Sequence, residues 1–234
     1  MKGQKKNCFG CTAHGSSLFC QLPKKELDMI QEIKTTQLYR KGEIIFHQET
    51  PSYGLHCIEA GTVKLFTQEE DGKEIIHRIS KSGDLLGACS FFGNKSYFES
   101  AKALEPVSCC FIDSTQLKEL LNGMPELYKE FILKLSHELL EANKRNTDMI
   151  RKNVRERLAT YFIKMADSLG NGNEDKASFT PHLSREEIAS YIGSAHETVI
   201  RCISEFKELG YIEEQNKTFT ILNKERLMCL GSHA

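Results

Sequence analysis

The chain has 234 residues, a formal net charge of −1, and a composition that is 40% hydrophobic and 27% charged. This length allows two domains with separate cores. No apolar run is long enough to span a bilayer, and the N-terminus lacks a signal-peptide core, so we expect a cytoplasmic protein without a membrane partner. The near-zero charge argues against a uniformly basic nucleic-acid binder. Any DNA-binding face must therefore be a local patch, with Arg185, Arg201, Lys207 and Lys217 as its candidate cations.

The first half of the chain is predicted to be rich in strands. Residues 1–21 carry three cysteines and little hydrophobic periodicity, whereas residues 24–33 predict a short helix. From Tyr39 to Ile112, glycines separate short alternating runs, and the runs at 63–66 and 75–79 flank a polar turn. About eight strands at this spacing indicate a compact barrel or sandwich.

A long helix is predicted from Glu126 to about Arg151, where apolar residues recur on one face without an internal glycine or proline. This apolar stripe is wider than a single barrel would cover, which favours a coiled-coil dimer seam. The alternative is a helix that lies along its own barrel. Another helix is predicted over 151–169, and a Gly-Asn loop follows at 170–173.

Residues 184–210 predict a helix-turn-helix. Ser184 and Glu187 form a capping box, and Gly193 supplies the turn between the two helices. The second helix buries an apolar face and exposes a polar one, on which an arginine can pair with guanine and a glutamate can accept from cytosine. The alternative is a helical hairpin inside a larger domain. The exposed positions of the second helix are His196, Glu197, Ile200 and Arg201. After this helix, the runs at 211–212 and 219–221 predict a two-stranded wing.

This order of elements resembles the CRP/FNR family of bacterial transcription regulators. The matching segments are KGEIIFHQ at 41–48, GLHCIEAGTVKL at 54–65, GDLLGACSFF at 83–92 and HETVIR at 196–201. The resemblance implies an α+β fold with a cysteine-bearing segment (1–21), a cyclic-nucleotide-binding-like β-roll (22–122), a dimerisation helix (123–151) and a winged helix-turn-helix (152–234).

The resemblance also implies a function. The protein is expected to be a homodimer that reads an inverted repeat in double-stranded DNA, with RNA polymerase as a further partner and no enzymatic activity. The family's base-reading positions fall on His196, Glu197, Ile200 and Arg201, although Ile200 departs from the small residue usual there. Ser184 and Arg185, at the start of the supporting helix, are expected to hold phosphates.

Cyclic-nucleotide binders of the family use a glutamate after the GDLLG-like turn and an Arg-Ser pair for the phosphate. Here the corresponding segments read Ala88-Cys89-Ser90 and Glu99-Ser100-Ala101. A carboxylate in place of the guanidinium would repel the phosphate, so we expect no tight cAMP binding.

The cysteines resemble those of the FNR-like, iron–sulfur branch of the family. That branch holds a [4Fe–4S] cluster with three N-terminal cysteines and one distant cysteine that follows an ALE-containing segment. The same pattern here is Cys8, Cys11 and Cys20 with Cys110 after Ala103-Leu104-Glu105, and Cys109 competes with Cys110 for the fourth position. Four thiolates can chelate such a cluster, which would make the regulator sensitive to oxygen or nitric oxide.

Alternatives remain for the signal. Structural zinc held by Cys8, Cys11 and Cys20 with His14, or a thiol switch, would use the same residues. Alternatively, the protein could sense another small molecule, or haem bound at His56 or His77, and the cysteines would then play no part in sensing. An enzyme using Cys–His or CxxC chemistry lacks a supporting fold. The other cysteines lie in apolar runs and are expected to be core thiols; they are Cys57, Cys89, Cys202 and Cys229.

Overall fold

The computed structural model describes residues 8, 11, 13, 15, 17–169 and 177–231. The side chains of residues 20, 21 and 169 are outside this description, as are His14 and the predicted loop at 170–173. The chain divides into two compact units, Met1–Leu140 and Glu141–Ala234. The long helix α4 (Pro125–Arg151) contributes residues to both.

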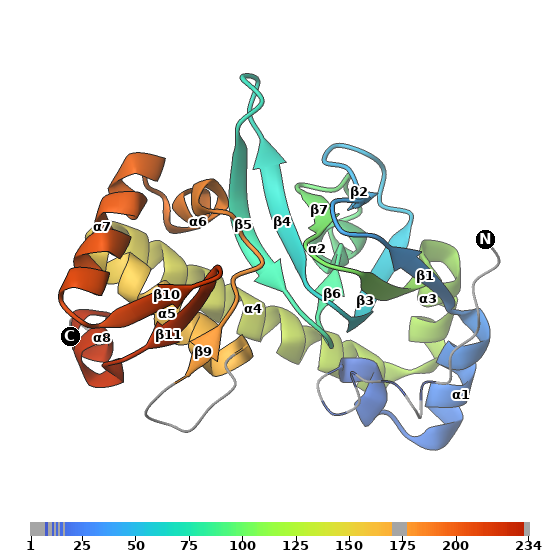
Figure 1. Ribbon diagram of the computed structural model, residues 1–234. Helices are drawn as coiled ribbons and strands as arrows, with labels where there is room; N and C mark the ends of the chain where they lie inside the picture. Colours follow the sequence, from blue (N-terminus) through green and yellow to red (C-terminus); the bar gives the residue numbers. More distant parts are fainter. Residues whose placement is uncertain are drawn as a thin grey trace. The chain divides into compact units, whose positions relative to one another are not determined.

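The first unit contains two four-stranded antiparallel sheets, ordered β1-β8-β3-β6 and β2-β7-β4-β5 (Figure 1). The strands are β1 (Thr35–Tyr39), β2 (Ile44–Phe46), β3 (Gly54–Ala60), β4 (Val63–Gln68), β5 (Glu74–Ser80), β6 (Leu85–Leu86), β7 (Ser100–Ala103) and β8 (Val107–Asp113). Besides α4, the described helical elements of this unit include the 3₁₀ helix η2 (Leu18–Gln21) and the α-helices α1 (Lys24–Ile33), α2 (Ala88–Phe92) and α3 (Ser114–Gly123).

Strand alternation gives the first unit two cores. In β8, Val107 and Cys109 point into the core that both sheets enclose, where they meet Ile58 and Leu65. Neighbouring residues point the other way because successive side chains of a strand alternate between the two faces. That second face packs under the helical segments; its core includes Cys57, Cys110, Ile112, Leu18, Phe19, Leu117, Leu127 and Phe131.

The second unit is built around α5 (Val154–Leu169). Its remaining elements are β9 (Ser178–Phe179), α6 (Arg185–Ile192), α7 (His196–Glu208), β10 (Ile212–Gln215), β11 (Thr218–Ile221) and α8 (Lys224–Gly231). The sheet has the order β10-β11-β9, and its core is aromatic: Phe162 of α5 lies edge-to-face with Phe219 at a centroid distance of 4.8 Å. Phe179 and Phe206 pack around the same ring.

Three elements were absent from the sequence expectation. The sequence predicts a two-stranded wing, but the short strand β9 adds a third strand by pairing with β11 at Phe179↔Phe219. Helices α2 and α8 are also additional. The polar residues 213–215 belong to β10, and only Asn216 and Lys217, both with positive φ, form the turn. In the described part of the chain, no helix is both long enough and apolar enough to cross a lipid bilayer.

Candidate DNA-binding helix and thiol site

The helix-turn-helix has the capping predicted from its sequence. Ser184 caps α6, because its hydroxyl accepts from the Glu187 amide while the Glu187 carboxylate accepts from the Ser184 amide. Gly193 follows the helix with φ +65°, a left-handed conformation that glycine adopts without strain. The amide of Ser194 donates to Ala189 at 2.9 Å and closes the turn. Helix α7 therefore begins at a defined angle to α6.

Helix α7 separates a buried and an exposed face. Val199, Cys202, Ile203 and Phe206 are buried. The four predicted base-reading residues lie together on the exposed face, where Ile200 remains 45% exposed. Among the described residues, the structure gives Glu197 and Arg201 no hydrogen-bond or ion-pair partner, so both side chains are available to a ligand. The complete exposed set is His196, Glu197, Ile200 and Arg201.

Arg185, the predicted phosphate-binding cation, is paired with residues of the second unit. Its guanidinium pairs with Glu214 of β10 and lies over the Phe219 ring at 4.5 Å from the centroid. Lys207 of α7 reaches the same carboxylate at 3.3 Å. One glutamate thus compensates two of the four cations considered for a DNA-binding patch. Arg201 remains the cation on the exposed face of α7 that Glu214 does not engage.

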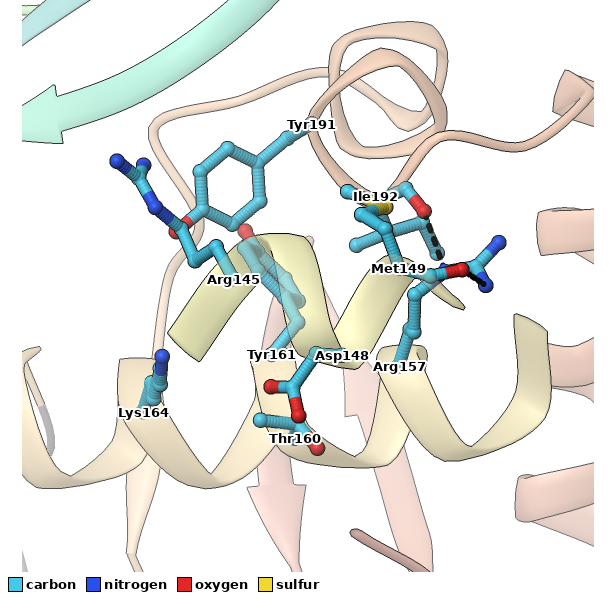
Figure 2. A pocket seen from close by; sticks show the side chains of 9 residues that line it. All are labelled: Arg145, Asp148, Met149, Arg157, Thr160, Tyr161, Lys164, Tyr191 and Ile192. Atoms are coloured by element: carbon cyan, nitrogen blue, oxygen red, sulfur yellow. Dashed lines mark hydrogen bonds between the residues drawn. The ribbon is translucent and has the colours of Figure 1, made fainter. Parts of the chain in front are cut away.

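Arg157 of α5 fixes the end of α6 and the end of α4. Figure 2 shows its side chain reaching the backbone of Ile192, and Nε donates to that carbonyl at 2.7 Å. Nη2 donates to the Gly193 carbonyl at 3.0 Å, while Nη1 donates to the carbonyls of Met149 and Lys152. Helix C-termini leave such carbonyls without intrahelical partners, and a cation is the favoured way to satisfy them.

A small cavity lies beside Arg157, between α5 and the last turns of α4 and α6 (Figure 2). Its volume of about 40 Å³ suits one or two water molecules and is far below that of a small-molecule site. Its lining includes Arg145, Tyr161 and Tyr191. We therefore assign it no ligand.

The thiol site lies on the outer face of the β1-β8-β3 sheet. Register places Cys110 directly opposite Thr36 on one side and Cys57 on the other. Lys34 is 4% exposed, and its Nζ lies 3.5 Å from Cys110 Sγ. The same ammonium interacts electrostatically with the Cys8 sulfur. Cys8 and Cys110 thus meet at one buried lysine.

Burial and charge act against each other at these thiols. Burial raises the pKa of the Cys8 and Cys110 thiols, and the Lys34 ammonium opposes this rise in both cases. For Lys34, burial would lower the pKa, but the Cys110 and Cys8 sulfurs outweigh it and the pKa of the ammonium is raised. The site therefore favours negative charge on sulfur more than an apolar pocket of the same depth would.

The structure separates the two adjacent candidates for the distant cysteine. Cys109 is fully buried in the core between the sheets, its thiol donates to the Cys57 carbonyl at 3.3 Å, and burial raises its pKa strongly. Cys110 lies on the opposite face, with Cys8. Strand alternation therefore directs only Cys110 toward the N-terminal segment.

The other N-terminal positions are partly described. Cys11 follows Cys8 in a turn in which its amide donates to the Cys8 carbonyl at 3.3 Å. Cys20 lies in η2, but its side chain and all of His14 fall outside the described residues. Among the described residues, no group of three or more Cys, His, Asp or Glu side chains is arranged to hold a metal ion.

Two features of this site were missed from the sequence. Lys34 and Cys57 join it only through the register of β1, β8 and β3, and no local motif marks either residue. The expectation of four core thiols is correct for Cys57 and Cys202 but wrong for Cys89 and Cys229, which are exposed. An apolar neighbourhood in sequence does not determine which face of a short helix a cysteine occupies.

The histidines considered as haem ligands are engaged elsewhere. His56 is buried between the Phe46 and Phe111 rings, and burial lowers its pKa to about 4. His77 Nε2 lies 2.9 Å from the Thr67 hydroxyl. Both rings are therefore held by neighbouring side chains of the first unit.

The β-roll carries an internal ion pair near the expected nucleotide region. Arg78 of β5 lies 2.8 Å from the Glu138 carboxylate of α4 and donates to the Leu85 carbonyl at 3.2 Å. Glu99, in the segment that would contact a cyclic phosphate, is half-buried. The arginine nearest the turn at 83–87 is therefore already paired with a carboxylate.

Comparisons with known proteins agree with both units. The cyclic nucleotide-binding domain family matches residues 36–123, and the Crp-like helix-turn-helix domain matches residues 156–230. Electron transport regulator A of Shewanella oneidensis is 29% identical over 229 residues, covering 97% of this chain and 91% of that protein. The fumarate and nitrate reduction regulatory protein of Escherichia coli K12 is 28% identical, with coverage of 97% and 91%.

Solved structures support the same fold. FixK2 from Bradyrhizobium japonicum is similar with a TM-score of 0.76 at 24% sequence identity, covering 86% of this chain and 99% of that chain. A CRP/FNR-family transcriptional regulator from Thermus thermophilus has a TM-score of 0.72 at 24% identity, with coverage of 85% and 100%.

A strand-rich domain of the cyclic-nucleotide-binding type, joined to a DNA-binding helix-turn-helix, defines a transcription regulator and not an enzyme. The chain belongs to the CRP/FNR family, and its relatives include FNR- and ANR-type regulators. The fold class and family expected from the sequence are thus confirmed.

Proposed function

We propose that this regulator acts as a homodimer that reads an inverted repeat, and that a [4Fe–4S] cluster held by Cys8, Cys11, Cys20 and Cys110 controls its activity in response to oxygen or nitric oxide. The observation that carries the proposal is the meeting of Cys8 and Cys110, which are far apart in the sequence of the first unit, at the Lys34 ammonium. Cys11 lies one turn from Cys8, and the backbone of Cys20 lies in η2, next to Phe19.

The residues present fit such a cluster. Thiolates are the ligands that iron–sulfur clusters take, and an adjacent cation offsets their charge. When bound, the cluster supplies a group that oxygen and nitric oxide can oxidise or dismantle. Structural zinc on the same cysteines and a thiol switch remain the competing proposals, and metal analysis separates all three.

The coupling we propose runs through an aromatic contact. Phe19, next to Cys20, lies edge-to-face with Phe131 of α4 at a centroid distance of 6.0 Å. Phe131 also contacts Phe92 at 5.0 Å, and all three rings lie in the first unit. Anchoring the N-terminal segment at the thiols would therefore keep Phe19 packed against α4 and stiffen that helix.

A second copy of this chain is the partner we propose for α4. Its first turns bury Leu127 and Phe131 in the first unit, yet Ile132, Leu139 and Leu140 stay 59–62% exposed. Ile132 and Leu139 are seven residues apart, as are Leu133 and Leu140, which is the spacing of a coiled-coil seam. The helix thus packs along its own barrel and still presents an apolar stripe.

On DNA, we propose that Glu197 and Arg201 read a C/G-containing core and that His196 and Ile200 flank it. Ile200 presents a branched apolar side chain, which suits a thymine methyl group. Ser184 and Arg185 would hold phosphates, with Arg185 exchanging part of its contact with Glu214.

From the family we also propose that RNA polymerase is a partner and that the protein is located in the cytoplasm. We further propose that it does not bind cAMP tightly. A micromolar cAMP affinity in calorimetry would contradict this last proposal.

The test is to purify the protein without oxygen and to count iron and acid-labile sulfide per chain. We expect about four of each, lost in Cys110→Ser and retained in Cys109→Ser. Air should then remove the iron and weaken binding to an inverted-repeat duplex. Zinc alone, or no metal, would overturn the cluster and leave the DNA-binding assignment standing.

A further inference from the structure

Lys34 is the unusual residue of the thiol site. It is 4% exposed, and lysine is rarely buried to this extent unless its ammonium is paired. Its ammonium donates to Cys110 Sγ at 3.5 Å and also interacts electrostatically with the Cys8 sulfur. The two partners are also two of the four cysteines in the proposed cluster site.

The backbone holds this lysine in place. The Lys34 amide donates to the Ile30 carbonyl at 3.0 Å, which ends α1. Two residues later Thr36 pairs with Cys110 in the β1–β8 ladder, so Lys34 and Thr36 point to the same face of the sheet as Cys110. A cation fixed between a helix end and a sheet costs little further ordering when a ligand binds.

We propose that Lys34 is a positioning residue of the cluster site, which donates N–H···S hydrogen bonds to Cys8 and Cys110 and so sets the reduction potential of the bound cluster. This inference rests on the proposed function. Four thiolates make such a site electron-rich, and a hydrogen bond or positive charge at a ligand sulfur stabilises the more reduced state. Lys34 therefore slows oxidation of the cluster and determines how much oxygen is needed to trigger the response.

The experiment compares Lys34→Met, which keeps the length of the side chain but removes its charge, with Lys34→Arg, which keeps the charge. Lys25→Met is the matched control, because it removes the same charge from an exposed position of α1. Each full-length variant is reconstituted without oxygen. Iron content, the midpoint potential of the cluster, and the rate at which the cluster absorbance decays in air are then measured.

We expect Lys34→Met to bind iron with a more negative potential. Loss of one charge-assisted hydrogen bond corresponds to about a tenfold shift in the reduction equilibrium, or about 59 mV for a one-electron couple. Its cluster should also decay faster in air. Lys34→Arg and Lys25→Met should both stay close to the unmodified protein. A purely structural role for Lys34 would leave the potential of the folded variant unchanged.

An unchanged potential and decay rate in Lys34→Met, with iron bound in the unmodified protein, would overturn this inference alone. Absence of iron from the unmodified protein would overturn the cluster proposal and this inference together. If circular dichroism shows that Lys34→Met does not fold, Lys34→Gln, which keeps a polar end group, replaces it with the same expected shift.

Discussion

The DNA-binding surface and the thiol site are built in opposite ways. The exposed face of α7 comes from one continuous stretch of chain, and its side chains need no partner from elsewhere to be presented. The thiol site joins four distant segments, represented by Cys8, Lys34, Cys57 and Cys110, and is buried. A surface of the first kind is ready whenever its unit is folded, whereas a site of the second kind exists only while its segments stay packed together.

This difference suits a regulator. The thiol site depends on contacts between separate segments and can be opened locally, whereas the DNA-binding unit must keep one shape. We therefore expect the second unit to tolerate core changes poorly and the first unit to respond to solution conditions. The following predictions test this contrast, from the largest effect to the smallest.

The largest expected effect is on the aromatic core of the DNA-binding unit. Phe162→Ala should destabilise that unit by about 3–5 kcal/mol, because a fully buried ring is replaced by a cavity. Urea unfolding followed by circular dichroism measures the change. Phe98→Ala, which removes a ring that is 70% exposed, is the matched control and should leave stability nearly unchanged. Equal losses of stability in the two variants would contradict the expected difference between the two units.

The first unit should lose stability on acidification through His56. Its pKa is lowered by burial from 6.5 to about 4, so the unfolded chain binds the proton first as pH falls. Stability from this residue is present above pH 6.5 and is lost progressively toward pH 4, by about 3 kcal/mol. Across this pH range, the free energy of unfolding should depend less on pH in His56→Leu than in the unmodified protein. His47 is exposed, so His47→Leu should keep the pH dependence of the unmodified protein. An equally strong pH dependence in His56→Leu would refute the assignment.

Arg201→Ala should weaken specific DNA binding by about 1–3 kcal/mol and blur specificity at one base pair. Fluorescence anisotropy with the inverted repeat and with single-substitution duplexes measures both effects. Arg226→Ala removes an equally charged, exposed side chain from α8 and serves as the control. An unchanged base preference in Arg201→Ala would remove this residue from the reading surface.

The smallest expected effect concerns the start of α6. Ser184→Ala removes the capping hydroxyl and should destabilise the second unit by about 1 kcal/mol. Ser204→Ala, at an exposed interior position of α7, should be neutral or slightly stabilising, since alanine is the better helix former. Thermal unfolding of the two variants side by side would show whether the cap, rather than any serine, is responsible.

The same contrast explains what the sequence could reveal. The capping box, the turn glycine and the two faces of α7 follow from residues within one or two helical turns, so local patterns predict them correctly. The strand content of the first unit is likewise visible in its alternation. Strand β9 is only two residues long and exists because Phe179 pairs with Phe219, so no local signal marks it.

The thiol site could be predicted only in part. The cysteine spacing and the resemblance direct attention to Cys8 and Cys110, but the choice between Cys109 and Cys110 depends on which face of β8 meets the N-terminal segment. Lys34 enters the site through the β1–β8 register, a pairing between residues far apart in the chain. Cys89 shows the reverse problem, because its apolar neighbours conceal an exposed position.

Arg157 carries a consequence for how such a regulator can change during evolution. One side chain satisfies carbonyls at the ends of both α4 and α6, within a single unit of the protein. A change of this one codon would alter how the helix-turn-helix is held while leaving every base-contacting residue intact. Selection can therefore adjust the strength of a response without redesigning the set of operators that the protein recognises.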